Sequence, residues 1–130
     1  MSYPVLILGE SGTGKTTSLR NLNPEHCVLI QSVKKPLPFR SAGWRRYDAA
    51  TKEGNVFVTD KSETIVRIIN GTSRPIVIID DFQYIMANEF MRRVLDKESG
   101  NAAFAKYNEI ARSVWDIINA AAQAGDVKRV

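Results

Sequence analysis

Gly9-Glu10-Ser11-Gly12-Thr13-Gly14-Lys15-Thr16 is the most specific motif in the sequence, and Thr17 follows it. The stretch fits the pattern G-x-x-x-x-G-K-[ST] at every specified position. Before it, residues 5–8 form a continuous apolar, β-prone run, which predicts a strand buried on both faces. After it, residues 15–20 have a helical pattern. A strand, a glycine-rich turn and a helix in this order predict a phosphate-binding loop.

The residue types of the loop suit the binding of a polyphosphate. Glycines let the backbone turn its N–H groups inward around the phosphates, and the start of the helix adds the positive end of its dipole. Lys15 is expected to reach the β- and γ-phosphates and to serve catalysis, and the Thr16 hydroxyl to bind Mg²⁺. We therefore assign residues 9–17 to nucleotide binding. The alternative is a chance match in a glycine-rich turn.

A second motif supplies the acidic group that a magnesium–nucleotide site needs. Residues 76–79 are four apolar residues, and Asp80 and Asp81 follow them. Because the carboxyl ends of parallel strands meet at the ligand side of a sheet, we expect Asp80 beside the loop as a metal ligand. Asp81 is expected to orient or deprotonate the attacking water. The alternative for both residues is a polar turn after a strand, and it is stronger for Asp81.

The rest of the chain alternates strands and helices. Strands are expected at residues 27–30, 55–59 and 75–79. Helices are expected from a capping box of Asp60 and Glu63, at residues 89–97 and at residues 102–124. This alternation predicts a single α/β domain over residues 1–130 with a mostly parallel sheet. On the last helix we expect Trp115 in the core beside a buried stripe of Phe104, Tyr107, Ala111, Val114, Ile118 and Ala121.

On residues 9–17 and 76–81 the sequence resembles the P-loop ATPases of the additional-strand group, which includes RecA-like and AAA-type proteins. The resemblance implies a three-layer P-loop sandwich that binds ATP and Mg²⁺. The first strand, residues 79–84 and the later helix also resemble phage-encoded nucleotide-binding proteins. Some of these are implied in single-strand annealing recombination. The narrower resemblance implies a role in phage DNA recombination or replication, in the host cytoplasm.

Two departures from the RecA-like and AAA-type pattern leave the activity open. RecA-like enzymes often carry a catalytic Glu where this chain has Gln31-Ser32, and AAA-type enzymes usually have Asp-Glu in place of Asp80-Asp81. We carry three hypotheses. The first is a Mg²⁺-dependent ATPase, the second a nucleotide-binding switch or assembly module with little hydrolysis, and the third a small nucleoside or nucleotide kinase. A GTPase is disfavoured because no Asn-Lys-x-Asp motif is present.

Charge gathers in one segment of the chain. Lys plus Arg is 18 and Asp plus Glu is 14, which gives a net charge of +4 among 130 residues. No acid lies between His26 and Tyr47, and this basic segment interleaves Trp44 with five cations, Lys34, Lys35, Arg40, Arg45 and Arg46. Cations with a stacking aromatic predict a groove for single-stranded DNA. The alternative is a solvated loop with Trp44 in the core.

The remaining features bound the class of protein. Cys27 is expected to be a small buried hydrophobe, and Arg92 and Arg93 to serve either as arginine fingers in a homo-oligomer or as a solvated helix face. Apolar runs of about five residues are far short of the roughly 20 that a membrane span needs, and no secretory signal is visible, so we expect a cytoplasmic protein. Residues 126–130 look like the start of another strand, which predicts a truncated or minimal core.

Overall fold

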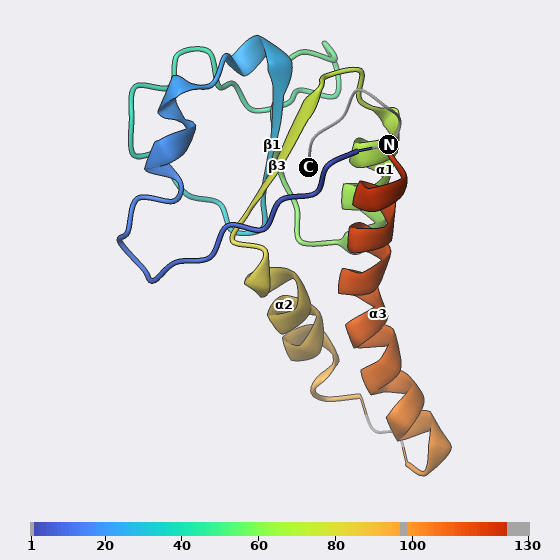
Figure 1. Cartoon of the computed structure of the whole chain (residues 1–130). Helices are drawn as coiled ribbons and strands as arrows, with labels where there is room; N and C mark the ends of the chain where they lie inside the picture. Colours follow the sequence, from blue (N-terminus) through green and yellow to red (C-terminus); the bar gives the residue numbers. More distant parts are fainter. Residues whose placement is uncertain (1, 97–98, 125–130) are drawn as a thin grey trace.

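Parallel strands form the centre of the molecule in a computed structural model that describes residues 2–96 and 99–124 (Figure 1). These strands are β1 (Cys27–Gln31), β2 (Val56–Val58) and β3 (Ile76–Asp80). β1 lies in the middle, where Leu29 stands opposite Val56 on one side and Ile78 on the other. This parallel pairing, with a helix between β2 and β3 and further helices after β3, confirms the α/β class.

β1 is buried along its whole length because both faces of the sheet are covered. On one face, Val28 and Ile30 pack against α1 (Ser62–Gly71) and α3 (Asn101–Gln123). On the other face, Cys27 and Leu29 pack against Trp44. Cys27 is therefore the buried hydrophobe that the sequence predicts, and burial raises the pKa of its thiol, which the charge of Arg74 only partly offsets.

The second face of the sheet is covered by short turns and loops. The helix expected at residues 15–20 is a 3-10 helix, η1 (Thr17–Asn21), and η2 (Pro24–His26) follows it. Pro24 cannot continue a helix, so the helix that begins at Thr17 ends before it. Only short 3-10 turns therefore precede β1. The apolar side chains that line this face come from η1 and the irregular chain after β1, at Leu19, Leu22, Leu37 and Phe39.

Residues 5–8 are not a strand, and the prediction of a buried strand there is wrong. The segment joins no ladder in the described part of the chain, and its four side chains are 65% to 82% exposed. It runs past the sheet from Ser2, whose hydroxyl donates to the carbonyl of Ala121 near the end of α3, to the loop at Gly9 (Figure 1). A continuous apolar run is buried only where another layer covers it. The core clusters on the two faces of the sheet do not include residues 5–8.

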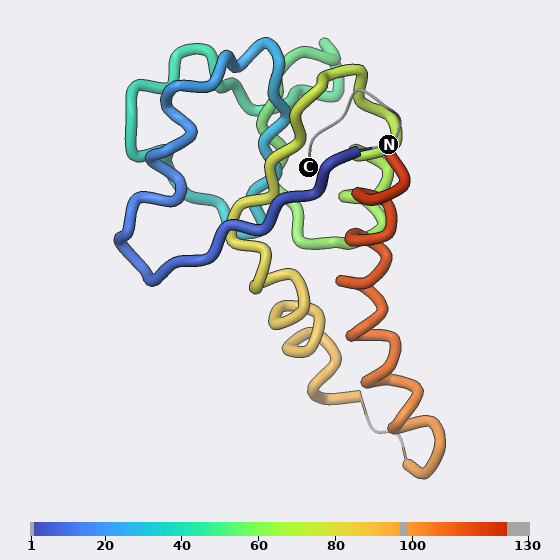
Figure 2. Tube along the Cα trace, in the orientation of Figure 1, coloured from blue at the N-terminus to red at the C-terminus, as the bar shows by residue number. Residues whose placement is uncertain are grey.

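Two helices leave the sheet and run side by side. α2 (Gln83–Arg93) begins at Gln83, well before the expected residue 89, and ends before Lys97, which lies outside the described residues. Figure 2 shows the trace descending away from the sheet through α2 and returning toward it through α3. Only Ile85, in the first turn of α2, belongs to the core cluster beside the sheet. The structure thus begins this helix six residues closer to β3 than the sequence pattern indicates.

The prediction of which face of α3 lies in the core is also largely wrong. Phe104 is 72% exposed and Trp115 is 60% exposed, while Val114 and Ala121 of the expected stripe do contact or enter the core. The buried residues form a different stripe at the same helical spacing, namely Lys106, Ile110, Ile117, Ala120 and Ala121. Both stripes satisfy a period of 3.6, so periodicity alone does not choose between them, and the larger side chains indicate the wrong one.

The predicted capping box at the start of α1 is absent. The helix begins after Lys61 without a side-chain cap, and the Asp60 carboxylate accepts hydrogen bonds from Asn88 and Arg92 of α2 instead. At the other end of the chain, the strand expected at residues 126–130 lies outside the described residues. Within the described ranges, no helix combines the length and the apolar character needed to cross a membrane.

Candidate functional site

The glycine-rich loop takes a compact turn that its glycines make accessible. Gly12 and Gly14 have φ of +79° and +90°, which glycine adopts at little steric cost. Thr13 folds back, and its backbone N–H and hydroxyl donate to the carbonyl of Glu10 at 3.4 and 2.8 Å. A Cβ atom on Gly9 would lie 2.8 Å from Thr13 Oγ1. Glycine at these positions therefore decides the shape of the loop.

The Lys15 ammonium lies against the loop itself. Its Nζ donates to the carbonyl oxygen of Gly9 at 2.5 Å and to that of Glu10 at 2.7 Å. The residue is exposed to solvent. Because hydrogen bonds between two charged groups are stronger than those to neutral carbonyls, this ammonium is placed to exchange the carbonyls for an anion that enters the loop.

Thr16 joins the loop to the second motif. Its hydroxyl lies 3.2 Å from each oxygen of the Asp80 carboxylate, although the two residues are 64 positions apart in the sequence. Asp80 is the last residue of β3, and the carboxyl end of that strand faces the loop. Its position beside the loop is the one that the strand pattern predicts.

Asp81 turns sharply away from the end of β3. Its φ of +58° is in the left-handed region, which Asp tolerates better than most residues. Its carboxylate is 2.6 Å from the Lys35 ammonium, which also lies 3.1 Å from Asp80. Burial opposes the charge of Lys35, but the hydrogen bonds and charges of Asp81 and Asp80 outweigh it and raise the Lys35 pKa above its usual value.

Gln31, the last residue of β1, and Ser32, which follows it, hold this arrangement together, and the sequence did not assign them this role. The Ser32 hydroxyl donates to the backbone carbonyls of Asp80 and Asp81 at 3.2 and 2.7 Å. The side-chain amide of Gln31 donates to the carbonyl of Lys35 at 3.1 Å. The position of these two residues in the sequence could have indicated this role. β1 and β3 are parallel neighbours, so residues at their carboxyl ends meet at one edge of the sheet.

A cavity of about 770 Å³ opens beside the loop. Its volume falls within the roughly 300–1,000 Å³ that is usual for ligand sites. Its lining includes Lys15 and Thr16 of the loop together with Lys35, Asp81 and Tyr84. Both candidate motifs therefore face the same space.

The donor set at this cavity suits Mg²⁺ in one specific way. Among the residues that the structure describes, no three His, Cys, Asp or Glu side chains gather as a metal site. Mg²⁺ in a nucleotide site needs only one or two protein oxygens, because phosphates and water supply the others. The Thr16 hydroxyl and the Asp80 carboxylate, already in contact, fit this requirement.

The basic segment does not act as one surface. Trp44 is only 8% exposed and packs edge-to-face on Phe39, which is the core alternative raised by the sequence. Lys35 faces the two aspartates. The cations that remain exposed are Lys34, Arg40, Arg45 and Arg46. A stacking platform at Trp44 would require the side chain to leave the core.

A smaller cavity of about 380 Å³ lies near η2. The Arg74 guanidinium reaches into this region, but it donates to the backbone carbonyls of Pro24 and Cys27 at 2.8 and 2.9 Å. Glu25 and Glu53 line the same cavity. The mixed charge gives this cavity no preference for an anion.

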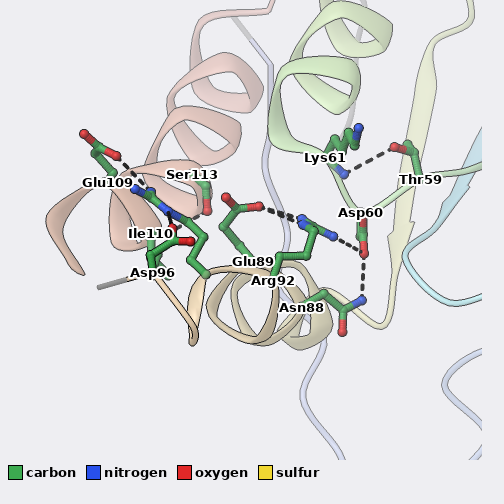
Figure 3. Close-up of polar contacts among 11 residues, drawn as sticks. Thr59, Asp60, Lys61, Asn88, Glu89, Arg92, Asp96, Glu109, Ile110 and Ser113 are labelled. Atoms are coloured by element: carbon green, nitrogen blue, oxygen red, sulfur yellow. Dashed lines mark hydrogen bonds and ion pairs between the residues drawn. The ribbon is translucent and has the colours of Figure 1, made fainter. Parts of the chain in front are cut away.

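Arg92 and Arg93 pair within the chain, and Figure 3 shows the contacts of Arg92. Arg92 contacts Asp60 at 2.8 Å and Glu89 at 2.6 Å, and Arg93 contacts Glu109 at 2.8 Å. These arginines therefore join α2 to the start of α1 and to α3. To act on a second copy of the chain, either arginine would first have to leave these partners.

Comparison of the chain with protein-family models, with curated proteins and with solved structures finds no significant match.

Proposed function

We propose that this chain binds ATP together with Mg²⁺ at residues 9–17, within a P-loop type of fold. One observation carries the proposal: the Thr16 hydroxyl lies 3.2 Å from the Asp80 carboxylate, beside a cavity that the loop lines. These are the two motifs that the sequence assigns to phosphate and metal. Their contact is what a magnesium–nucleotide site requires.

The charges around the cavity suit a polyphosphate that carries a metal ion. Lys15 supplies an ammonium at the loop, and the positive φ of the loop glycines is the kind of backbone geometry that lets N–H groups turn toward an anion. Asp80 and Thr16 would hold Mg²⁺, which neutralises phosphate charge when it is bound. Lys15 would bind and orient the terminal phosphates.

We propose hydrolysis of ATP as the activity, with Asp81 as the residue that orients the attacking water. Its carboxylate lies at the cavity, beside Asp80. A carboxylate at this place suits the positioning or deprotonation of a water molecule.

A second candidate function, a nucleotide-binding switch or assembly module with little hydrolysis, is favoured by a different observation. The Asp81 carboxylate is 2.6 Å from the Lys35 ammonium. Gln31 lies at the position where RecA-like enzymes often carry Glu, and its side-chain amide donates to the Lys35 carbonyl. A carboxylate oxygen that is already held by an ammonium is less available to a water molecule.

A role in phage DNA recombination or replication rests on the resemblance to phage-encoded nucleotide-binding proteins. The exposed cations Lys34, Arg40, Arg45 and Arg46 are the residues through which single-stranded DNA would be bound. Because Trp44 is buried, such binding would depend on phosphate contacts and would weaken with salt.

The first experiment is a calorimetric titration of the purified chain with ATP and GTP in the presence of Mg²⁺. We expect Lys15→Ala to lower ATP affinity by roughly 100-fold, because a charge-assisted contact to phosphate is lost. Lys34→Ala is the matched control, since Lys34 is an exposed lysine away from the loop. Unchanged ATP affinity in Lys15→Ala would refute the nucleotide site.

Phosphate release then separates the two candidate functions. Turnover is measured with and without single-stranded DNA, and Lys15→Ala gives the background. Turnover above this background supports the ATPase. Binding of ATP with turnover equal to the background supports the switch or assembly module.

A further inference from the structure

Lys35 stands at the meeting point of the two motifs. Its ammonium lies 3.1 Å from Asp80 Oδ2 and 2.6 Å from Asp81 Oδ2. The same Asp80 oxygen is 3.2 Å from the hydroxyl of Thr16. The oxygens suited to a magnesium ion are therefore already neutralised by a cation of the chain itself.

The ammonium and a metal ion compete for one place. A divalent cation bound to the Asp80 carboxylate would stand within a few ångström of an ammonium that shares the same oxygen. Like charges at that distance repel strongly in a partly buried site. The side chains of Asp80 and Asp81 are only 13% and 23% exposed, so water screens this repulsion incompletely.

The main chain of Lys35 is fixed, whereas its side chain has room to move. The Gln31 amide binds the Lys35 carbonyl at 3.1 Å, and β1 carries Gln31 in the sheet. The Lys35 side chain is about one-third exposed and lines the 770 Å³ cavity. Its four-carbon stem lets the ammonium swing from the carboxylates into the cavity without any change in the fold.

We propose that Lys35 is a resident counter-ion that keeps divalent metal out of the Asp80–Thr16 position until a polyphosphate enters the cavity. An entering polyphosphate supplies the negative charge that allows the metal and the ammonium to coexist, because Lys35 then moves to the phosphate. Metal alone binds weakly, and metal and nucleotide bind together. The inference rests on the proposed function, since it concerns the same site.

The test is a titration of Mn²⁺ alone, without nucleotide, followed by the electron paramagnetic resonance signal of the free ion. Lys35→Met keeps most of the stem and removes the charge. It should bind Mn²⁺ at least about tenfold more tightly than the unaltered chain, because a charge in contact changes cation affinity by this order. Lys35→Arg keeps the charge and should behave like the unaltered chain.

Lys34→Met is the matched control for net charge, because Lys34 is exposed and makes no contact with the two aspartates among the contacts of the described residues. Equal Mn²⁺ affinity in Lys35→Met and the unaltered chain would overturn the inference, and so would an equal gain in Lys34→Met. Thermal melting checks that each variant folds. Lys35→Gln replaces Lys35→Met if the latter does not fold.

ATP binding and Mn²⁺ affinity test the nucleotide site and the counter-ion separately. If the unaltered chain does not bind ATP but Lys35→Met gains Mn²⁺ affinity, the role of Lys35 as a counter-ion is supported and the nucleotide site is refuted. If ATP binds and Mn²⁺ affinity does not change in Lys35→Met, the nucleotide site stands and the counter-ion falls.

Discussion

Gly54, in the turn before β2, has no room for a side chain. Its φ is +103°, and a Cβ atom would collide with the carbonyl group of Arg46 and lie 2.7 Å from the Cα of Tyr47. These neighbours are backbone, which cannot rotate aside. We expect Gly54→Ala to lower the free energy of unfolding by about 3 kcal/mol, from backbone strain and steric overlap together.

Gly71, the last residue of α1, is the matched control. A Cβ there meets nothing within 4 Å, and the helix favours alanine. Gly71→Ala should raise the free energy of unfolding by up to about 1 kcal/mol. Urea unfolding followed by circular dichroism measures both variants. A loss in Gly54→Ala no larger than about 0.5 kcal/mol would contradict the tight turn.

At the residue scale, the sequence predicts the site residues that lie within continuous motifs. Lys15 and Thr16 are specified by their spacing, and Asp80 by its place after an apolar run. Lys35 could not be assigned in the same way, because it lies in an irregular segment with no period. Its contact with Asp80 and Asp81 depends on how Gln31 holds that segment, and only the folded chain shows this.

At the scale of elements, Asp60 links two helices. It lies just before α1, and its carboxylate accepts hydrogen bonds from Asn88 and Arg92 of α2, both at 2.8 Å (Figure 3). Burial alone would raise the pKa of Asp60, but these two hydrogen bonds and the charge of Arg92 outweigh burial and hold the pKa below its usual value. The ionised carboxylate therefore stabilises the folded state.

The pH dependence of this link has a definite sign. Because the folded-state pKa is below the unfolded value of about 3.9, the stabilisation is fully present above that value and is lost as pH falls through the folded pKa. We expect Asp60→Asn to lower the free energy of unfolding by about 1 kcal/mol at pH 7 and to reduce the loss of stability between pH 5 and pH 3.

Urea unfolding at several pH values between 3 and 7 checks this prediction. Asp116→Asn is the control, because Asp116 is half exposed and lies 3.6 Å from Arg112 on the same helix. Such an exposed pair contributes little. An equal change in the two variants would show that Asp60 makes no special contribution.

The elements differ in how well the sequence predicts them, for a physical reason. β1 is a short apolar run that is fully buried, and β3 is a similar run that is buried at Val77 and partly buried elsewhere. Such runs leave few alternatives to a strand inside a sheet. Residues 5–8 have the same pattern yet lie exposed, because burial depends on neighbours that a local pattern does not contain. The start of α2 at Gln83 was missed since its first turns mix apolar and polar residues without a clear stripe.

At the scale of the whole molecule, two side-chain hydrogen bonds join the N-terminal segment to the body among the residues that the structure describes. One is the Ser2 hydroxyl on the carbonyl of Ala121, and the other is the Thr16 hydroxyl on Asp80. Between these contacts the segment contributes no strand to the sheet, and its apolar side chains face solvent. Regions with few buried contacts open at low free energy, so we expect this segment to open before the sheet does.

A nucleotide bound at the loop would tie this segment to the end of β3 and change the order of opening. Trypsin cleaves after Lys15 and Arg20, which are both exposed. We expect Mg²⁺ and ATP at about 100 times the dissociation constant to stabilise the folded chain by about 2.7 kcal/mol. Cleavage after Lys15 and Arg20 should slow by at least about tenfold, because cleavage follows the population of the open form.

Mass spectrometry of the early fragments measures each cleavage separately. Cleavage after Lys52 is the internal control, since Lys52 is exposed in a turn and does not line the 770 Å³ cavity. Its rate should change little if the segment opens locally. Equal protection at Lys52 would mean that the chain opens as one unit. Unchanged cleavage after Lys15 in a chain shown to bind ATP would mean that the nucleotide does not join the N-terminal segment to the sheet, and the contact between Thr16 and Asp80 would then not be part of the bound state.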